Sequence, residues 1–130
     1  MADHPNAALY ERYVDMVSRG DIDAVASLLA EDVVWREPGG RHAFSGREAL
    51  LEQMTWVVSN LEVHIDVHDV LANNEHTVAL IDWRMRSGGH ELTARMVETW
   101  HVFEGQVKER WLFVEDIEAF VDFFTTLDGR

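Results

Sequence analysis

The sequence has no cysteine, few basic residues and no long apolar run. Without cysteine, the chain can form neither disulfides nor a cysteine-ligated metal site. No apolar run approaches the roughly 20 residues that a membrane-spanning helix needs. The first residues also lack the basic segment and apolar core of a signal peptide. We therefore expect a cytoplasmic protein that does not enter a membrane.

Acidic residues strongly outnumber basic ones. The 130 residues include 24 Asp and Glu against 11 Lys and Arg, which gives a formal net charge of −13 at pH 7. A surface with this charge repels nucleic acids and anionic membranes, so we expect neither as a partner. The length indicates a single domain over 1–130. Five Trp and six Phe can fill its core or line a cavity.

Residues 33–40 combine a short apolar run with one carboxylate. If the run is a strand, alternation places Trp35 and Glu37 on one face, next to the loop that begins at Pro38. Burial against an indole disfavours the charged carboxylate, which raises its pKa toward the range of a general base. The alternative is a Glu on an edge strand that faces water.

The hydrophobic periods predict helices, one early strand, a run of strands and a last helix. Apolar residues three or four apart indicate the helices, and alternation indicates the strands. The expected helices cover residues 6–19, 21–29, 45–58 and 116–124, with Asn6, Asp21, Ser45 and Asp116 as N-terminal caps. The expected strands cover residues 33–37, 61–68, 77–86, 91–103 and 107–114.

Turns between the last four strands predict an antiparallel meander. Long strands in a small sheet must twist and curl. Helices on one face of such a sheet give an α+β fold shaped like a cone, with a pocket between the layers.

Several segments, in this order, resemble one known superfamily. They are Glu11-Arg12-Tyr13-Val14, Arg19-Gly20-Asp21, Leu28-Leu29-Ala30-Glu31-Asp32-Val33, Glu37-Pro38-Gly39-Gly40, Ser45-Gly46-Arg47-Glu48-Ala49, Phe103-Glu104-Gly105-Gln106-Val107 and Glu109-Arg110-Trp111. Over nearly its whole length the chain is similar to nuclear-transport-factor-two-like proteins, in their SnoaL-like and ketosteroid-isomerase-like branch. The resemblance implies the cone fold. It does not imply one reaction, because the fold hosts isomerases, cyclases, hydrolases, dehydratases and non-enzymes.

The ketosteroid-isomerase pattern implies roles for individual residues. Its oxyanion-hole tyrosine corresponds to Tyr13, and its general base corresponds to Glu37, with Glu in place of Asp. The protonated Asp that shares the oxyanion hole in that mechanism corresponds to Thr99 or to the adjacent Glu98. A threonine there would weaken the oxyanion hole. The polyketide-cyclase pattern would place its acid near Leu112, which cannot transfer a proton.

The resemblance also implies which side chains face into the cone. The expected pocket set is Trp35, Glu37, Met54, Val78, Leu80, Asp82, Arg84, Val97, Thr99, His101, Arg110, Leu112 and Val114. Because isolated buried charges are costly, we expect Asp82 to pair with Arg84. Arg110 could pair with Glu37 or with a substrate anion, and an Arg beside Glu37 would lower the pKa of that carboxyl and keep it ionised.

The opposite face of the sheet is then strongly apolar. The expected outward set is Trp83, Met85, Met96, Trp100, Trp111 and Phe113. An exposed apolar patch of this size usually marks a partner surface, and we expect a homodimer through it. If the facing is inverted, these aromatic residues line the pocket and the charged residues face water.

Histidines offer a second acid/base candidate but no metal site. His101 could transfer protons near neutral pH, or it could be a satisfied structural residue. His64 and His68 share a strand face about 13 Å apart, too far to bind one ion. We expect no metal and no cofactor.

Three functions fit these features. The favoured one is an isomerase-like or cyclase-like enzyme that acts on a small apolar or amphipathic carbonyl compound. Glu37 would move the proton, and Tyr13, with His101 or Thr99, would stabilise the oxyanion. The second is a hydrolase or dehydratase centred on Asp82 and Arg84. With Glu37, these two residues loosely resemble the Asp-Arg-Asp cluster of limonene-type epoxide hydrolases, without its spacing. The third is a non-catalytic ligand-binding or dimerisation module.

Overall fold

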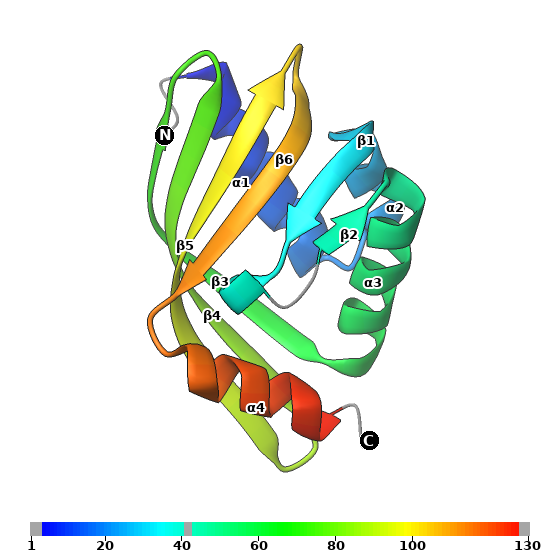
Figure 1. The fold of residues 1–130 in the computed structure, drawn as a ribbon, viewed down its shortest axis with the longest axis vertical. Coiled ribbons are helices and arrows are strands. Elements are labelled where there is room, and N and C mark those ends of the chain that lie inside the picture. The colour runs from blue at the N-terminus through cyan, green and yellow to red at the C-terminus, as the bar shows by residue number, and fades with distance from the viewer. Residues whose placement is uncertain (1–3, 41–42, 128–130) are drawn as a thin grey trace.

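The computed structural model shows a curled six-stranded sheet with helices packed against it (Figure 1). It describes residues 4–40 and 43–127. Residues 1–3, which belong to the segment that we expect not to be a signal peptide, lie outside the described residues. The elements are α1 (Pro5–Ser18), α2 (Ile22–Ala26), β1 (Leu29–Arg36), η1 (Pro38–Gly40), β2 (Ala43–Ser45), α3 (Arg47–Asn60), β3 (Glu62–Ala72), β4 (His76–Ser87), β5 (His90–Phe103), β6 (Gln106–Val114) and α4 (Ile117–Leu127). The predicted α+β cone is confirmed. Within the described residues, no helix is both long and apolar enough to cross a membrane.

Two predicted helix caps were wrong. Helix α1 begins at Pro5, a residue favoured in the first turn, and His4 is its cap because its Nδ1 accepts the backbone N–H of Asn6 at 3.0 Å. Helix α3 is capped by Gly46, whose φ of 94° lies in the region that favours glycine. Ser45 cannot cap α3 as predicted, because it pairs with β1 as the last residue of β2.

The other two predicted caps are confirmed. The Asp21 carboxylate accepts the Ala24 N–H at 3.2 Å, and the Asp116 carboxylate accepts the Ala119 N–H at 3.0 Å. Helix α2 is shorter than predicted, because the chain from Leu29 onward already pairs with β6 as a strand.

Strands β3 to β6 form the predicted antiparallel meander, and β1 continues the sheet beside β6. The β1–β6 pair is parallel, with Trp35 opposite Arg110, whereas all other strand pairs in the described sheet are antiparallel. This pairing joins an early strand to the last one, which local patterns in the sequence do not reveal. It places the end of β1 against the middle of β6.

A β-bulge in β6 separates the facing of Arg110 from the facing predicted for β5, because His101 pairs with Glu109 and Val102 with Val107, which leaves Lys108 as the extra residue. The register shifts between His101 and Val102. Beyond the shift, Arg110 lies opposite Trp100. An uninterrupted ladder from the hairpin turn would place Arg110 opposite Thr99, as the sequence-based facing assumed. Because side chains alternate between faces, a shift of one residue exchanges the two faces.

The predicted facing is therefore right for Arg110 and Leu112 of β6 and wrong for β4 and β5. Strand β4 pairs with β5 without a shift, so the reversal extends to both strands. The residues that turn toward the helices are Thr77, Ala79, Ile81, Trp83, Met85, Leu92, Ala94, Met96, Glu98, Trp100 and Val102. The residues on the outer face are Val78, Leu80, Asp82, Arg84, Val97, Thr99 and His101.

Four aromatic rings form the centre of the core between α1 and the sheet. Tyr10 and Tyr13 of α1 pack against Trp100, with ring centroids 4.8 and 5.1 Å apart. Trp35 adds to the cluster at 6.1 Å from Tyr13 and 6.5 Å from Trp100. Such pairs each contribute about 0.5–1.5 kcal/mol beyond their buried area. The cluster holds α1 across β1 and β5.

Candidate functional site

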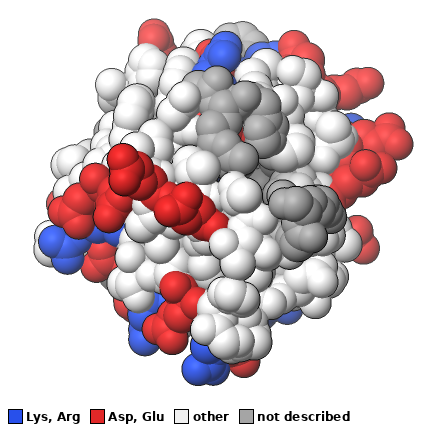
Figure 2. Space-filling model, turned by 60° about the horizontal axis from the view of Figure 1, so that its bottom comes forward, with Lys and Arg blue, Asp and Glu red and all other residues white. Residues whose placement is uncertain are grey.

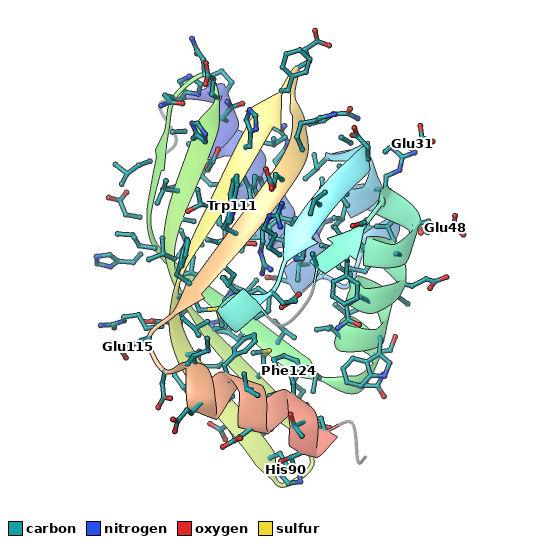
Figure 3. All side chains as sticks on the ribbon, viewed as in Figure 1. Glu31, Glu48, His90, Trp111, Glu115 and Phe124 are labelled. Atoms are coloured by element: carbon teal, nitrogen blue, oxygen red, sulfur yellow. The ribbon has the colours of Figure 1, made fainter. Side chains whose placement is uncertain are left out.

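A cavity of about 530 Å³ lies between the sheet and the helices, a volume typical of small-molecule sites. Its wall is mostly apolar, and its aromatic members are Tyr13, Trp35, Phe44, Trp56, Trp83, Phe120 and Phe124. Figure 3 shows Phe124 of α4 directed toward the body of the molecule. The described charged residues of the wall are Glu37, Glu52 and Arg110.

Arg110 is the centre of a buried polar network. Its Nε donates to Glu98 Oε2 at 2.9 Å, and its Nη1 donates to the carbonyl oxygen of Arg36 at 3.1 Å. The Tyr10 hydroxyl donates to the other oxygen of Glu98, Oε1, at 2.7 Å. Glu98 and Arg110 are 1% and 3% exposed, so the ion pair is almost completely buried, although Arg110 also lines the cavity. The network joins α1, β1, β5 and β6.

Glu37 lies where this network meets the cavity. It directly follows β1, and its Oε1 lies 3.8 Å from Arg110 Nη1. Its side chain is 19% exposed, so it is the more accessible of the two carboxylates beside Arg110. The ring of Trp35 covers one face of the guanidinium, 4.5 Å from Cζ to the ring centroid. The structure thus brings Glu37, Trp35 and Arg110 together, with Glu98 as the closer partner of Arg110.

Tyr13 supplies a neutral hydroxyl to the cavity wall. It is 2% exposed, and burial raises its pKa well above the usual range, with a further rise from the negative charge of Glu98. Among the described residues its hydroxyl has no hydrogen-bond partner, whereas that of Tyr10 is occupied by Glu98. Tyr13 can therefore donate a hydrogen bond to a ligand without losing its proton.

Burial lowers the pKa of Arg110, but the negative charges of Glu98 and Glu37 outweigh this effect and raise it overall. Arg110 consequently stays charged at any pH at which the protein is folded. A fixed positive charge beside Glu37 is part of the site.

The charged residues predicted for the pocket on β4 lie on the outer face. Asp82 pairs with Arg95 of β5 at 3.0 Å, and Arg84 lies 3.6 Å from Asp66 of β3. The expected Asp82–Arg84 pair does not form. Both residues share the solvent-facing side of β4, where neighbouring strands supply their partners.

Leu80, Thr99 and His101 also lie outside the cavity. The ring of His101 stacks on that of His76, with centroids 5.3 Å apart. The predicted placement of these side chains in the pocket was wrong because β4 and β5 alternate without a break, and the bulge in β6 places Arg110 on the face opposite to Thr99 and His101. Of the predicted catalytic and pocket residues, those that do line the cavity are Tyr13, Trp35, Glu37, Met54, Arg110 and Leu112.

Glu98 is the functional residue that sequence reasoning weighed only as a neighbour of Thr99. It occupies the inward position, and Thr99 faces outward. The sequence of β5 does contain a signal for this, because alternation places Glu98 on the same face as the apolar residues Met96, Trp100 and Val102. A carboxylate in an alternating apolar series must have a buried partner. The partner, Arg110, could be identified only from the register.

Among the described residues, no three His, Asp or Glu side chains are grouped so that they could hold a metal ion. The ionisable groups that the described residues present at the cavity are two carboxylates, a phenol and a guanidinium.

We expect Glu98→Gln to destabilise the protein by about 3–5 kcal/mol, because it leaves the buried Arg110 without its bonded counter-charge. The free energy of unfolding would be measured in urea at neutral pH. Asp82→Asn is the matched control, since it also removes one carboxylate from an Arg pair, but at the surface, and should leave the urea midpoint nearly unchanged. Equal effects of the two substitutions would contradict the structural role of Glu98.

The native protein should show no phenolate absorbance near pH 10, the ordinary pKa of tyrosine. Tyr10 and Tyr13 are the only tyrosines in the chain, and burial raises the pKa of both. Their contribution to stability is therefore fully present below about pH 10 and is lost as the pH rises toward the higher folded-state values. A spectrophotometric titration with circular dichroism at each pH checks this. Phenolate that forms at about pH 10 while the dichroism stays native would disprove the burial of these hydroxyls.

Comparisons with known proteins agree with the fold. Residues 10–110 match the family model of the SnoaL-like domain. Bal32a, from a soil-derived mobile gene cassette, has a similar structure with a TM-score of 0.84 and 21% identity, over 92% of this chain and 95% of that one. A Mycobacterium tuberculosis LEH-like epoxide hydrolase gives a TM-score of 0.80 and 14% identity, over 96% of this chain and 93% of that one.

A third similar structure is SalBIII, an epoxide hydrolase/cyclase-like enzyme in pyran ring formation in the polyether salinomycin. Its TM-score is 0.76 and its identity is 20%, over 85% of this chain and 90% of that one. No curated protein matches the sequence. At these identities the structures establish the fold alone, and the family model covers most of the sequence. The chain belongs to the SnoaL-like family, within the nuclear-transport-factor-two-like fold.

Proposed function

We propose that this protein is a cytoplasmic, cofactor-independent enzyme of the isomerase or cyclase type that acts on an apolar carbonyl compound. The observation that carries the proposal is the grouping of Glu37, Tyr13 and Arg110 on the wall of one largely apolar cavity. A base, a neutral hydrogen-bond donor and a fixed positive charge are the groups that proton transfer next to a carbonyl requires.

In the proposed reaction, Glu37 removes a proton from the carbon next to the substrate carbonyl. The electron pair of the broken C–H bond moves to the carbonyl oxygen, and the Tyr13 hydroxyl stabilises the oxyanion by a hydrogen bond. Because burial raises the pKa of Tyr13, the hydroxyl donates without being deprotonated. Glu37 then returns the proton to a second carbon while the oxyanion re-forms the carbonyl, so that a double bond shifts. In the cyclase variant, the enolate carbon attacks a second carbonyl of the same substrate, whose C=O π bond breaks, and the resulting alkoxide takes the proton from Glu37.

Arg110 assists by holding a positive charge 3.8 Å from Glu37. The hydrogen bonds of Glu98 and Arg36 fix its orientation, so it needs no rearrangement when charge develops. Glu98 and Tyr10 act through Arg110 and are positioning residues. The surrounding aromatic wall keeps water away and strengthens these electrostatic interactions.

A hydrolase is the second candidate, at a different centre from the one the sequence suggested. Asp82 and Arg84 face away from the cavity, but Glu37, Arg110 and Glu98 form a carboxylate–arginine–carboxylate cluster at its wall. This composition is the one expected for an epoxide hydrolase of the limonene type. The accessible Glu37 would then activate water instead of abstracting a proton from carbon.

We also propose that the protein forms a homodimer through the outer patch, which we define as Leu71, Val78, Leu80, Val97, Trp111 and Phe113. These apolar side chains lie side by side on four neighbouring strands. Phe113 is 59% exposed and Leu71 is 56% exposed, although both are large and apolar. Figure 3 labels Trp111 on β6 in this part of the sheet. A second copy would remove this surface from water.

Glu37→Gln should lower turnover by roughly 10² or more, the usual contribution of a general base, while ligand binding persists. Turnover would be measured on a panel of conjugated ketones and epoxides, so that the substrate converted also separates the two candidate reactions. Asp82→Asn is the control and should keep full activity. If Glu37→Gln is as active as the wild type on every substrate converted, Glu37 is not the base.

Phe113→Glu should convert the dimer into a monomer, because it places a charge in the apolar contact. Light scattering after size-exclusion chromatography, over a range of protein concentrations, measures this. Phe103→Glu is the control, since Phe103 is equally exposed at 59% but lies about 20 Å further along β5. A wild-type protein that is monomeric at all concentrations would rule out the dimer.

A further inference from the structure

The charges at the cavity are unbalanced. Among the described lining residues, Glu37 and Glu52 each contribute one negative formal charge, and Arg110 contributes the opposing positive charge. Glu98, directly behind the wall, already neutralises Arg110 at 2.9 Å. The accessible charge on this part of the wall is therefore negative.

Arg110 offers little to an anionic ligand. Its Nε and Nη1 are engaged by Glu98 and by the Arg36 carbonyl oxygen, and Trp35 covers one face of its guanidinium. Only 3% of the residue is exposed. A ligand carboxylate would have to displace these contacts and would also lie close to Glu37, with a high cost in desolvation and repulsion.

The rest of the wall favours a positive charge. Trp56, Trp83 and Phe124 line the cavity with aromatic rings, whose faces attract cations. Glu52 lines the cavity and is also exposed, which places a carboxylate at the opening. The hydroxyl of Tyr13, which has no hydrogen-bond partner among the described residues, provides a separate contact for a polar atom of the ligand.

The whole molecule supports the same choice. Its formal net charge of −13 attracts cations and repels anions over long distances. Figure 2 shows one face of the molecule, on which acidic side chains predominate over basic ones.

We propose that the cavity selects amphiphilic organic cations, in which an apolar body fills the aromatic part and a protonated amine or quaternary ammonium lies near Glu37 and Glu52. The proposal rests on the proposed function, because it names the substrate class for the same cavity: a carbonyl compound that carries an amine. It excludes carboxylates, which an accessible arginine would have favoured.

Three probes of nearly equal size and shape test the proposal: 4-phenylbutylammonium, 4-phenylbutan-1-ol and 4-phenylbutanoate. Their affinities would be measured at pH 7 by calorimetry, or by the fluorescence of the cavity residues Trp35, Trp56 and Trp83. We expect the ammonium to bind about tenfold more tightly than the alcohol at low salt, and the carboxylate to bind most weakly. Added salt should reduce the advantage of the ammonium and leave the alcohol unaffected.

Matched variants separate the cavity from the overall charge. Glu37→Gln and Glu52→Gln should each reduce the ratio of ammonium to alcohol affinity. Glu31→Gln and Glu48→Gln change the net charge equally, and Figure 3 shows both side chains at the outer edge of the molecule, away from the cavity. These two controls should preserve the ratio.

The outcomes also distinguish this proposal from the proposed function. Any one of four results would overturn cation selection: equal binding of ammonium and alcohol, preference for the carboxylate, no binding of any probe, or equal loss of the ratio of ammonium to alcohol affinity in all four variants. None of these results depends on turnover, so a loss of activity in Glu37→Gln would remain evidence for Glu37 as the base. A cation preference that needs Glu52, together with unchanged turnover in Glu37→Gln, would instead support cation selection and refute the proposed base.

Discussion

The buried ion pair between Arg110 and Glu98 determines how the parts of this protein fit together. A guanidinium inside a small domain needs a counter-charge and hydrogen-bond partners, and these come from three other elements: Glu98 of β5, the Arg36 carbonyl oxygen of β1, and Tyr10 of α1 through Glu98. The first helix, the first strand and the last two strands are therefore held in one arrangement. Trp35, stacked on the guanidinium, and Glu37, 3.8 Å from it, take their positions from the same pair.

A buried ion pair is a poor source of net stability, because the cost of removing two charges from water approaches their mutual attraction. An apolar pair of similar volume could fill the same space. An apolar pair, however, would not hold a positive charge beside an accessible carboxylate on the cavity wall, as Arg110 does beside Glu37. Glu98 supplies the compensation that allows Arg110 to stay there, and it also removes Arg110 as a free binding group for anions. The proposed support for Glu37 and the proposed selection against anionic ligands thus have one physical origin.

The bulge at Lys108 of β6, opposite the step from His101 to Val102, decides which residues can share this site. A regular ladder would place Arg110 opposite Thr99, on the face of Thr99 and His101 and away from Glu98. With the bulge, Glu98 and Trp100 face inward, and Asp82, Arg84 and His101 meet partners at the surface. One extra residue in a strand therefore accounts for the difference between the predicted and the observed cavity. The predicted cavity was lined by several charged residues, whereas the observed one is lined by aromatic rings around one arginine whose charge Glu98 balances.

By itself, the sequence determined the order of the elements, the antiparallel meander and the placement of Trp35 and Glu37 on one strand end, because hydrophobic period, turns and alternation are local properties. The resemblance to a known superfamily agreed with the cone fold and added the expected role of Tyr13 and the inward facing of Arg110. Only the tertiary structure decided that β1 pairs in parallel with β6, that Glu98 and not Thr99 faces Arg110, and that α4 closes the cavity with Phe120 and Phe124. The physical reason is that these features depend on strand register and on contacts between distant segments. In a ladder with a period of two, a shift of one residue exchanges the faces without changing the local pattern.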